Sequence, residues 1–192
     1  MSLSAPRIVA RTDRLTLREL TIDDVDGLLE VLGDPLAMEH YPAPKTRVET
    51  EAWIAWARDS YQQNGFGLWA VERTADGAFL GDCGPMLQPV DGELVPEIGY
   101  HIVRREWDRG YATEAAVACR NLVLGEFGFG RVVSIVAPEN LASRRVAEKV
   151  HDTMREFVWE KSGRPMCLFE SRRPRPLPLA DQRANGGRLA GR

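Results

Sequence analysis

The sequence predicts an α/β or α+β domain with three layers, in which helices cover a central sheet. Segments with period-two alternation of apolar and polar residues predict strands, and segments with apolar residues at helical spacing predict helices. The two kinds of segment are interleaved along the chain, and the first half also contains the signature of a hairpin. Elements arranged in this way bury their apolar faces by packing helices against a sheet.

The first half of the chain carries clear start and stop signals for its helices. Thr21 and Thr46 each precede an acidic residue by three positions, which is the spacing of a capping box. Gly33 and Gly65 follow the last apolar positions and end the two helices. The expected elements are a strand at 15–20, helices at 22–32 and 47–63, and hairpin strands at 66–72 and 78–87.

The second half alternates more regularly between strands and helices. Its expected elements are a strand at 94–103, a helix at 113–126, a strand at 132–137, a helix at 141–150 and hairpin strands at 154–159 and 165–170. Beyond these elements Pro, Gly and Arg dominate, a composition typical of disorder. We therefore expect a single domain over residues 1–171 and a disordered tail over residues 172–192.

Composition and charge exclude several classes of protein. The chain is 44% hydrophobic and 28% charged, as ordinary globular proteins are, and no apolar run approaches the ~20 residues that span a bilayer. We expect a cytoplasmic protein without membrane contact. The net charge of −3 combines an acidic body with an Arg-rich end, which argues against nucleic-acid binding and suits an amine substrate. The cysteines lack metal-ligand spacing, so we expect buried thiols and no metal.

The turn at residues 104–115 leads from the strand at 94–103 into the next helix. A helix start leaves about four N–H groups unpaired and carries roughly half a positive charge, so it can hold a phosphate. Gly110 and Ala112 leave the approach open, and Arg109 can add charge. The turn is neither a P-loop nor a dinucleotide fingerprint. It predicts a site for a diphosphate.

Three blocks of sequence around this turn resemble the GNAT acyl-CoA N-acyltransferases. They are Glu-Ile-Gly-Tyr at 97–100, Trp-Asp-Arg-Gly-Tyr-Ala-Thr-Glu-Ala at 107–115 and Asn-x-x-Ser-Arg-Arg-Val-x-Glu-Lys at 140–149. With Thr-Asp-Arg-Leu-x-Leu-Arg at 12–18, they are similar to the Rim-type branch, which includes N-terminal acetyltransferases of ribosomal proteins. The resemblance covers about residues 8–170. It implies a mixed, mostly antiparallel sheet with a splayed strand pair, and acetyl-CoA as acyl donor.

The resemblance also implies a cofactor site along the strand, the turn and the helix. Amides of residues 109–113 would hold the pyrophosphate, and the backbone of residues 102–104 would bind the pantetheine arm as an added edge does. Asn140 would reach the cofactor at the gap between the splayed strands; alternatively, it only caps the following helix. The predicted cofactor-binding residues are Ile102, Val103, Arg104, Arg109, Gly110, Tyr111, Ala112, Thr113 and Asn140.

The catalytic candidates are Glu97 and Ser143. Glu97 matches the Glu of the family segment, and burial would raise its pKa to suit a general base; a solvent-facing or salt-bridged carboxylate is the alternative. The Tyr that many members use as the acid is replaced here by Ala147. Ser143, matching the Rim-type Ser, could instead donate to the leaving sulfur, or be a plain polar residue of the first turn. His101 ranks second as a base.

The acceptor site is expected beside His101, with Trp53 or Trp56 as a wall; plain core aromatics are the alternative. A modest base favours a protein N-terminal α-amine, with a pKa of ~7.7–8.0, over lysine at ~10.4. We expect direct attack in a ternary complex, since no cysteine falls at a matched catalytic position. A small-molecule amine acceptor and an inactive acyl-CoA-binding regulatory module remain as alternatives. A monomer or homodimer is expected.

Overall fold

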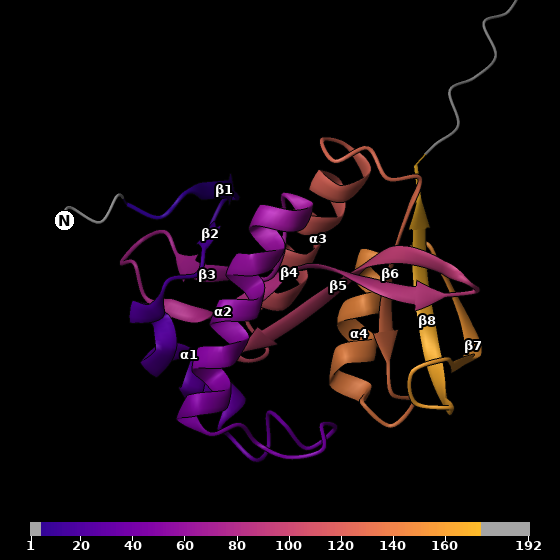
Figure 1. The fold of residues 1–192 in the computed structure, drawn as a ribbon, viewed down its shortest axis with the longest axis horizontal. Coiled ribbons are helices and arrows are strands. Elements are labelled where there is room, and N and C mark those ends of the chain that lie inside the picture. The colour runs from indigo at the N-terminus through magenta and orange to yellow at the C-terminus, as the bar shows by residue number, and fades with distance from the viewer. Residues whose placement is uncertain (1–4, 174–192) are drawn as a thin grey trace, which may run out of the picture.

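The computed structural model describes residues 5–173, which form one mixed sheet with helices on both faces (Figure 1). The sheet has 8 strands in the order β1-β2-β3-β4-β5-β6-β8-β7. Every neighbouring pair is antiparallel except β5 and β6, which are parallel. The strands are β1 Ile8–Arg11, β2 Leu15–Glu19, β3 Trp69–Arg73, β4 Phe79–Val90, β5 Glu93–Ile102, β6 Arg131–Val136, β7 Thr153–Trp159 and β8 Arg164–Arg172. The predicted fold class is confirmed.

Helices α1 (Val25–Leu32) and α2 (Arg47–Asn64) cover one face, and α3 (Tyr111–Leu124) covers the other. Alternation along β3 separates the two cores, because successive side chains point to opposite faces. Ala70 packs with the cluster of α1 and α2, whereas Trp69 and Val71 pack with that of α3. Helix α4 (Leu141–Val150) packs on β6 and β8 through Ala147.

Both predicted capping boxes are present, at Thr21 and at Thr46. The first opens a short 3-10 turn, η1 (Ile22–Asp24), before α1, whereas the expected helix was continuous from residue 22. Helix α2 ends at Gly65, whose φ of 78° is the left-handed geometry of a C-cap. Strand β1 was not predicted; it is short and pairs with β2 at the edge of the sheet.

The β4–β5 hairpin turns at Asp91 and Gly92, with φ values of 55° and 76°. A two-residue loop with both values positive matches the twist of the strands. The far half of the hairpin packs against β6 and β8, where Val90, Val95, Val133 and Leu168 form a small core. Figure 1 shows the hairpin reaching across these strands.

Most of the predicted tail, residues 174–192, lies outside the described residues. Of its first two residues, Arg172 ends β8, and the N–H of Arg173 donates to the carbonyl of Gly130 at 3.0 Å.

The three cysteines are free and buried, as expected for small apolar side chains. The sulfurs of Cys83 and Cys119 lie 3.6 Å apart in the core between β4 and α3. Within residues 5–173, no group of three or more His, Cys, Asp or Glu side chains is placed to hold a metal ion. None of the helices in this part of the chain is long and apolar enough to cross a membrane.

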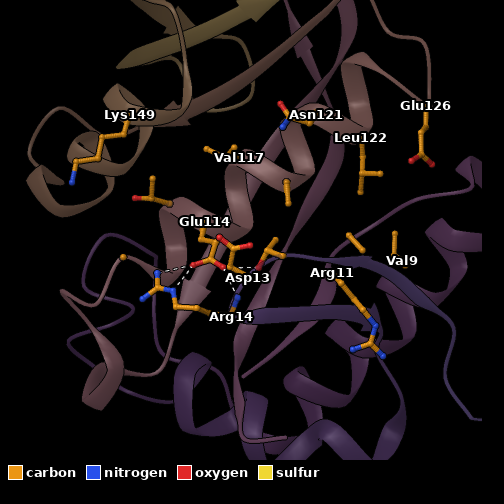
Figure 2. A pocket seen from close by; sticks show the side chains of 15 residues that line it. Val9, Arg11, Asp13, Arg14, Glu114, Val117, Asn121, Leu122, Glu126 and Lys149 are labelled. Carbon is orange, nitrogen blue, oxygen red and sulfur yellow. Dashed lines mark hydrogen bonds and ion pairs between the residues drawn. The ribbon is translucent and has the colours of Figure 1, made fainter. Parts of the chain in front are cut away.

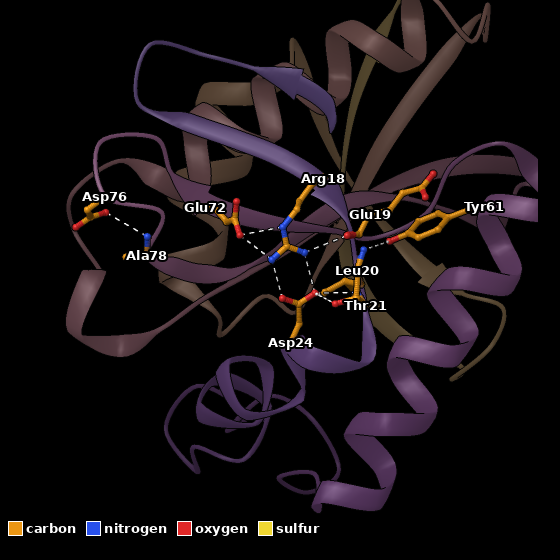
Figure 3. Close-up of polar contacts among 9 residues, drawn as sticks. All are labelled: Arg18, Glu19, Leu20, Thr21, Asp24, Tyr61, Glu72, Asp76 and Ala78. Atoms are coloured by element: carbon orange, nitrogen blue, oxygen red, sulfur yellow. Dashed lines mark hydrogen bonds and ion pairs between the residues drawn. The ribbon is translucent and has the colours of Figure 1, made fainter. Parts of the chain in front are cut away.

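An ion-pair network around Arg18 ties β2 and β3 to η1 (Figure 3). The guanidinium donates to both oxygens of Asp24, at 2.8 and 2.7 Å, and to Glu72 Oε1 at 2.9 Å from Nε. Asp24 also accepts the backbone N–H of Thr21 at 2.7 Å. Burial raises the pKa of Asp24, but the hydrogen bonds from Arg18 and Thr21 outweigh it and lower that pKa below its ordinary value.

Replacing Arg18 with methionine should lower the free energy of unfolding by about 3 kcal/mol, because two largely buried carboxylates lose their partner. The lowered pKa of Asp24 makes its stabilisation present above the unfolded pKa of ~3.9 and lost as the pH falls through the folded pKa. Urea unfolding should therefore show the variant and the wild type converging as the pH falls below the unfolded pKa of ~3.9. Arg7→Met, at an exposed pair with Glu19, is the control and should cost under about 1 kcal/mol. Equal losses for both variants would contradict the role of the network.

Candidate active site

A cleft of about 360 Å³ opens at the end of β5. The register joins β5 to β6 at Glu97 and Val133, and the strands diverge beyond that pair. The loop after α1, the turn before α3 and the first turns of α4 complete the walls. Residues of the predicted site that line the cleft are His101, Ile102, Gly110, Tyr111, Ala112, Thr113, Asn140 and Ser143.

The N-terminus of α3 forms one end of this cleft. Gly110 is the N-cap and has a φ of 81°, a left-handed conformation that favours glycine. The helix starts at Tyr111, two residues before the predicted start at Thr113. Amides of the first turn have no partner within the helix and lie at the positive end of its dipole. Because the same residues line the cleft, they can hold an anionic group there.

A second groove, of about 870 Å³, lies between β1 and α3 and is also lined by Gly110 (Figure 2). At its floor Arg14 holds the start of α3: its Nε donates to Glu114 Oε2 at 2.6 Å, and its Nη1 donates to the Arg109 carbonyl at 3.0 Å. Thr12 donates its hydroxyl to the other Glu114 oxygen at 2.5 Å. Glu114 thus bonds to the β1–β2 turn and leaves the first-turn amides of α3 available.

Three predicted cofactor residues lie beside the cleft without lining it: Val103, Arg104 and Arg109. Val103 is buried, and its N–H donates to the Leu80 carbonyl at 2.8 Å. Arg104 Nε donates to Asp34 Oδ2 at 2.8 Å, and Arg109 pairs with Glu106 at 3.2 Å. Ile102 reaches the cleft, although its carbonyl already accepts from the Trp107 indole at 2.6 Å.

Glu97 lies buried where β5 meets β6 and does not line the cleft. The N–H of Ile135 donates to its Oε1 at 3.2 Å. Burial raises the pKa of Glu97 to about 7, even though the hydrogen bonds from Ile135 and from the Gln88 side chain act to lower it. The carboxyl is therefore neither solvent-facing nor held in a close ion pair, and it titrates in the range where a general base operates.

His101 lies four residues further along β5, on the same face of the strand, and lines the cleft. Its Nδ1 is 2.7 Å from Oδ1 of the fully buried Asp82, and its Nε2 is 2.7 Å from the Tyr41 hydroxyl. Burial acts to lower the pKa of His101, but Tyr41 and the Asp82 carboxylate raise it to about 10. His101 and Tyr41 line the cleft, so this hydrogen-bonded chain runs from the interior to the cleft wall.

Neither Trp53 nor Trp56 lines the cleft. Trp53 stands behind the wall, where its indole N–H donates to Asp82 Oδ2 at 2.9 Å and its ring lies 6.0 Å from that of His101. Trp56 is 43% exposed and packs on Trp53, with ring centroids 5.4 Å apart. Trp53 thus touches the site only through Asp82 and His101.

Asn140 and Ser143 lie at the start of α4 and line the cleft. Asn140 is the N-cap, and its Oδ1 accepts the N–H of Ser143 at 3.0 Å. The carbonyl of Ser143 accepts from the Tyr100 hydroxyl at 2.8 Å. Residue 147 of α4 is a fully buried alanine, so this position supplies no hydroxyl to the cleft. The capping role predicted as an alternative for Asn140 is therefore present.

Comparison with known proteins identifies the family of this chain. The model of the acetyltransferase (GNAT) domain matches residues 14–151. The uncharacterized protein YkkB of Bacillus subtilis is 37% identical over 162 residues, which cover 83% of this chain and 92% of YkkB.

Two solved structures share the fold. The acetyltransferase from Agrobacterium tumefaciens has a TM-score of 0.75 and 24% identity over 90% of this chain and 98% of its own. The RimL ribosomal L7/L12 alpha-N-protein acetyltransferase in complex with coenzyme A has a TM-score of 0.69 and 16% identity, over 86% and 98%. On the match of the domain model, which covers well over half of the chain, the chain belongs to the GNAT family of acetyltransferases.

Proposed function

We propose that this acetyltransferase carries an acetyl group from acetyl-CoA to a primary amine and that its favoured acceptor is a protein N-terminal α-amine. The observation that supports this proposal most directly is that one cleft joins the N-terminus of α3 to His101 and Tyr41 at the end of β5. A long donor with an anionic end and a reactive end fits such a cleft. Its anionic end would lie at the N-terminus of α3, and its reactive end would lie near His101 and Tyr41.

The donor is proposed to lie with its diphosphate on the first-turn amides of residues 111–113. Arg145 and Lys149 on α4 line the same cleft and add positive charge at that end. The pantetheine arm would follow the edge of β5 at Ile102, where β6 has diverged. This arrangement brings the thioester toward Ser143, between the α4 wall and the α1–α2 loop. Val103, Arg104 and Arg109 support the turn from outside the cleft.

The amine is proposed to attack the thioester carbonyl directly. Glu97 would accept the amine proton through a bridging water, because its carboxyl does not line the cleft. Its pKa of about 7 suits an α-amine, whose deprotonation at neutral pH costs roughly 1 kcal/mol. The Ser143 hydroxyl would orient the sulfur by a hydrogen bond. Trp53 contributes by holding Asp82.

A second candidate acceptor is a small cationic amine. The loop after α1 contributes Leu36, Ala37, Glu39, His40 and Tyr41 to the cleft. The Glu39 carboxylate would attract a positively charged amine there, whereas Glu106, which also lines the cleft, already pairs with Arg73 and Arg109. The acidic side chain of this loop is the feature that favours a small cationic amine over a peptide.

Thiol release from acetyl-CoA should be measured against free N-terminal peptides, N-blocked lysine peptides, polyamines and amino sugars, with calorimetry of acetyl-CoA alone. At pH near 7, an α-amine is roughly 300-fold more neutral than a lysine, since their pKa values differ by about 2.5 units. We expect kcat/KM to favour the N-terminal peptides over the lysine peptides by at least about tenfold. Faster turnover of polyamines or amino sugars would establish the second candidate. Binding of acetyl-CoA without turnover of any amine would indicate the regulatory module.

A further inference from the structure

Tyr41, His101 and Asp82 form a hydrogen-bonded chain that ends on a hydroxyl in the cleft. The proposed function uses Glu97 and Ser143 but assigns no role to the phenol. We propose that Tyr41 is the proton donor to the departing thiolate, and that His101 and Asp82 are positioning residues that hold its hydroxyl and restore its proton. This inference rests on the proposed acetyl transfer.

The geometry fixes which atoms carry hydrogen. Oδ2 of Asp82 accepts from the Trp53 indole at 2.9 Å, and Oδ1 lies 2.7 Å from His101 Nδ1. A carboxylate can only accept, so the Nδ1 of His101 carries a proton and points its Nε2 at Tyr41, 2.7 Å away. Asp82 is fully buried and His101 is 9% exposed, so water does not compete for these bonds.

The charge on His101 decides the direction of the last bond. The Asp82 carboxylate at 2.7 Å raises the pKa of His101, so the ring is an imidazolium at neutral pH and its Nε2–H donates to the Tyr41 oxygen. The hydrogen of the Tyr41 hydroxyl is then free to point away from His101. Because Tyr41 is 43% exposed and lines the cleft, that hydrogen is available to a group bound there.

The groups around His101 favour this charged state. Asp82 faces it from β4, Tyr41 from the loop after α1, and Glu97 lies four residues away on the same face of β5. Helix α2 contributes the uncharged Trp53, and Lys45 lies beyond it, 4.9 Å from the centroid of an indole ring. The closest charged group is thus the Asp82 carboxylate, which stabilises the imidazolium.

The proposed step balances without an added reactant. As the tetrahedral intermediate collapses, the C–S bond breaks and its electron pair stays on sulfur. The O–H bond of Tyr41 breaks and an S–H bond forms, while the Nε2 proton of His101 moves to the phenolate oxygen. Neutral His101 then regains a proton from solvent, which has received the one lost by the amine. The net transfer is one proton from nitrogen to sulfur.

A phenol held in this way is matched to its task. A phenol is ordinarily a weaker acid than a thiol, so proton transfer from a phenol to a thiolate needs assistance. A charge-assisted hydrogen bond from His101 to the developing phenolate supplies that assistance. The Ser143 hydroxyl has no such partner among the described contacts and is the weaker acid, so it is better suited to orienting the sulfur.

The test uses the full-length chain with the best amine of the acceptor panel at saturation. Tyr41→Phe should lower kcat about 100-fold while the Kd of acetyl-CoA stays within about twofold, since only the proton donor is removed. Asp82→Asn should move the alkaline limb of the kcat–pH profile down by at least about one unit, because the imidazolium loses its carboxylate. Tyr100→Phe is the matched phenol control and should leave that limb in place.

The outcomes separate the two proposals. Normal kcat in Tyr41→Phe, with wild-type turnover intact, would overturn this inference and leave the acetyl transfer standing. Absence of wild-type turnover on every amine would overturn both. If Asp82→Asn fails to fold, His101→Gln replaces it, because glutamine keeps a hydrogen bond to Tyr41 but cannot carry the charge. An alkaline limb that stays in place in His101→Gln would show that the chain has only a structural role.

Discussion

Replacing Gly110 with valine is expected to weaken acetyl-CoA binding at least about a hundredfold. At a φ of 81°, a branched residue costs about 1–2 kcal/mol, so the turn either strains or shifts. A Cβ at Gly110 would meet only Arg14 Nη2, at 3.5 Å, so the protein itself leaves this space open beside the cleft. Because the added Cβ faces Arg14, valine would displace the Arg14 side chain and the turn that together hold the first-turn amides toward the cleft. Losing two charge-assisted bonds, at about 1.5–3 kcal/mol each, corresponds to this fold-change.

Gly77→Val is the control for backbone strain. Gly77 lies in the β3–β4 turn with a φ of 71°, and a Cβ there meets nothing within 4 Å. Both variants should therefore lose similar stability in thermal unfolding, whereas calorimetry should show weakened acetyl-CoA binding for Gly110→Val alone. If the two variants bind acetyl-CoA equally well, the N-terminus of α3 is not the phosphate site.

Replacing Glu97 with glutamine is expected to lower kcat by about 10²–10³ without weakening acetyl-CoA binding. Glu97 accepts a proton only when ionised, so wild-type kcat should rise with pH through about 7. The variant should lose this acid limb and keep the alkaline limb assigned to His101. Initial rates from pH 5.5 to 10.5, with acetyl-CoA and the amine saturating, would test both limbs.

Stability provides the control for Glu97→Gln. Because the folded pKa of Glu97 is raised above the unfolded value of ~4.3, the wild type loses stability as the pH rises from there to about 7. Glutamine carries no charge at any pH, so the variant should melt at or above the wild-type temperature at pH 8. A stable variant with normal turnover would restrict Glu97 to a structural role.

Local sequence signals account for most of the fold. The capping boxes at Thr21 and Thr46 and the glycine at 65 fixed the helices of the first half, because each acts through neighbouring backbone groups. Strand β1 escaped prediction since four residues at a sheet edge show little alternation and depend on pairing with β2. The early start of α3 reflects the left-handed Gly110, whose conformation depends on tertiary contacts made by Arg14.

Part of the site could also be predicted from the sequence. A two-residue turn at Asp91 and Gly92 places Asp82 directly opposite His101 in the hairpin, so that contact follows from the register. The contact between Tyr41 and His101 spans 60 positions and has no comparable local signal. The direction of Trp53 was equally unpredictable, because its indole follows the buried Asp82 carboxylate and not the cleft.

The bonds of Arg14 to Glu114 and to the Arg109 carbonyl couple the edge of the sheet to the start of α3. Any ligand that binds only when this helix start is intact selects conformations in which the β1–β2 hairpin is closed. Ligand release and fraying of the first strands are then coupled equilibria. The free energy by which the closed hairpin favours ligand binding equals the free energy by which the ligand favours the closed hairpin. With the donor bound at this helix start as proposed, the β1–β2 hairpin is therefore also held closed.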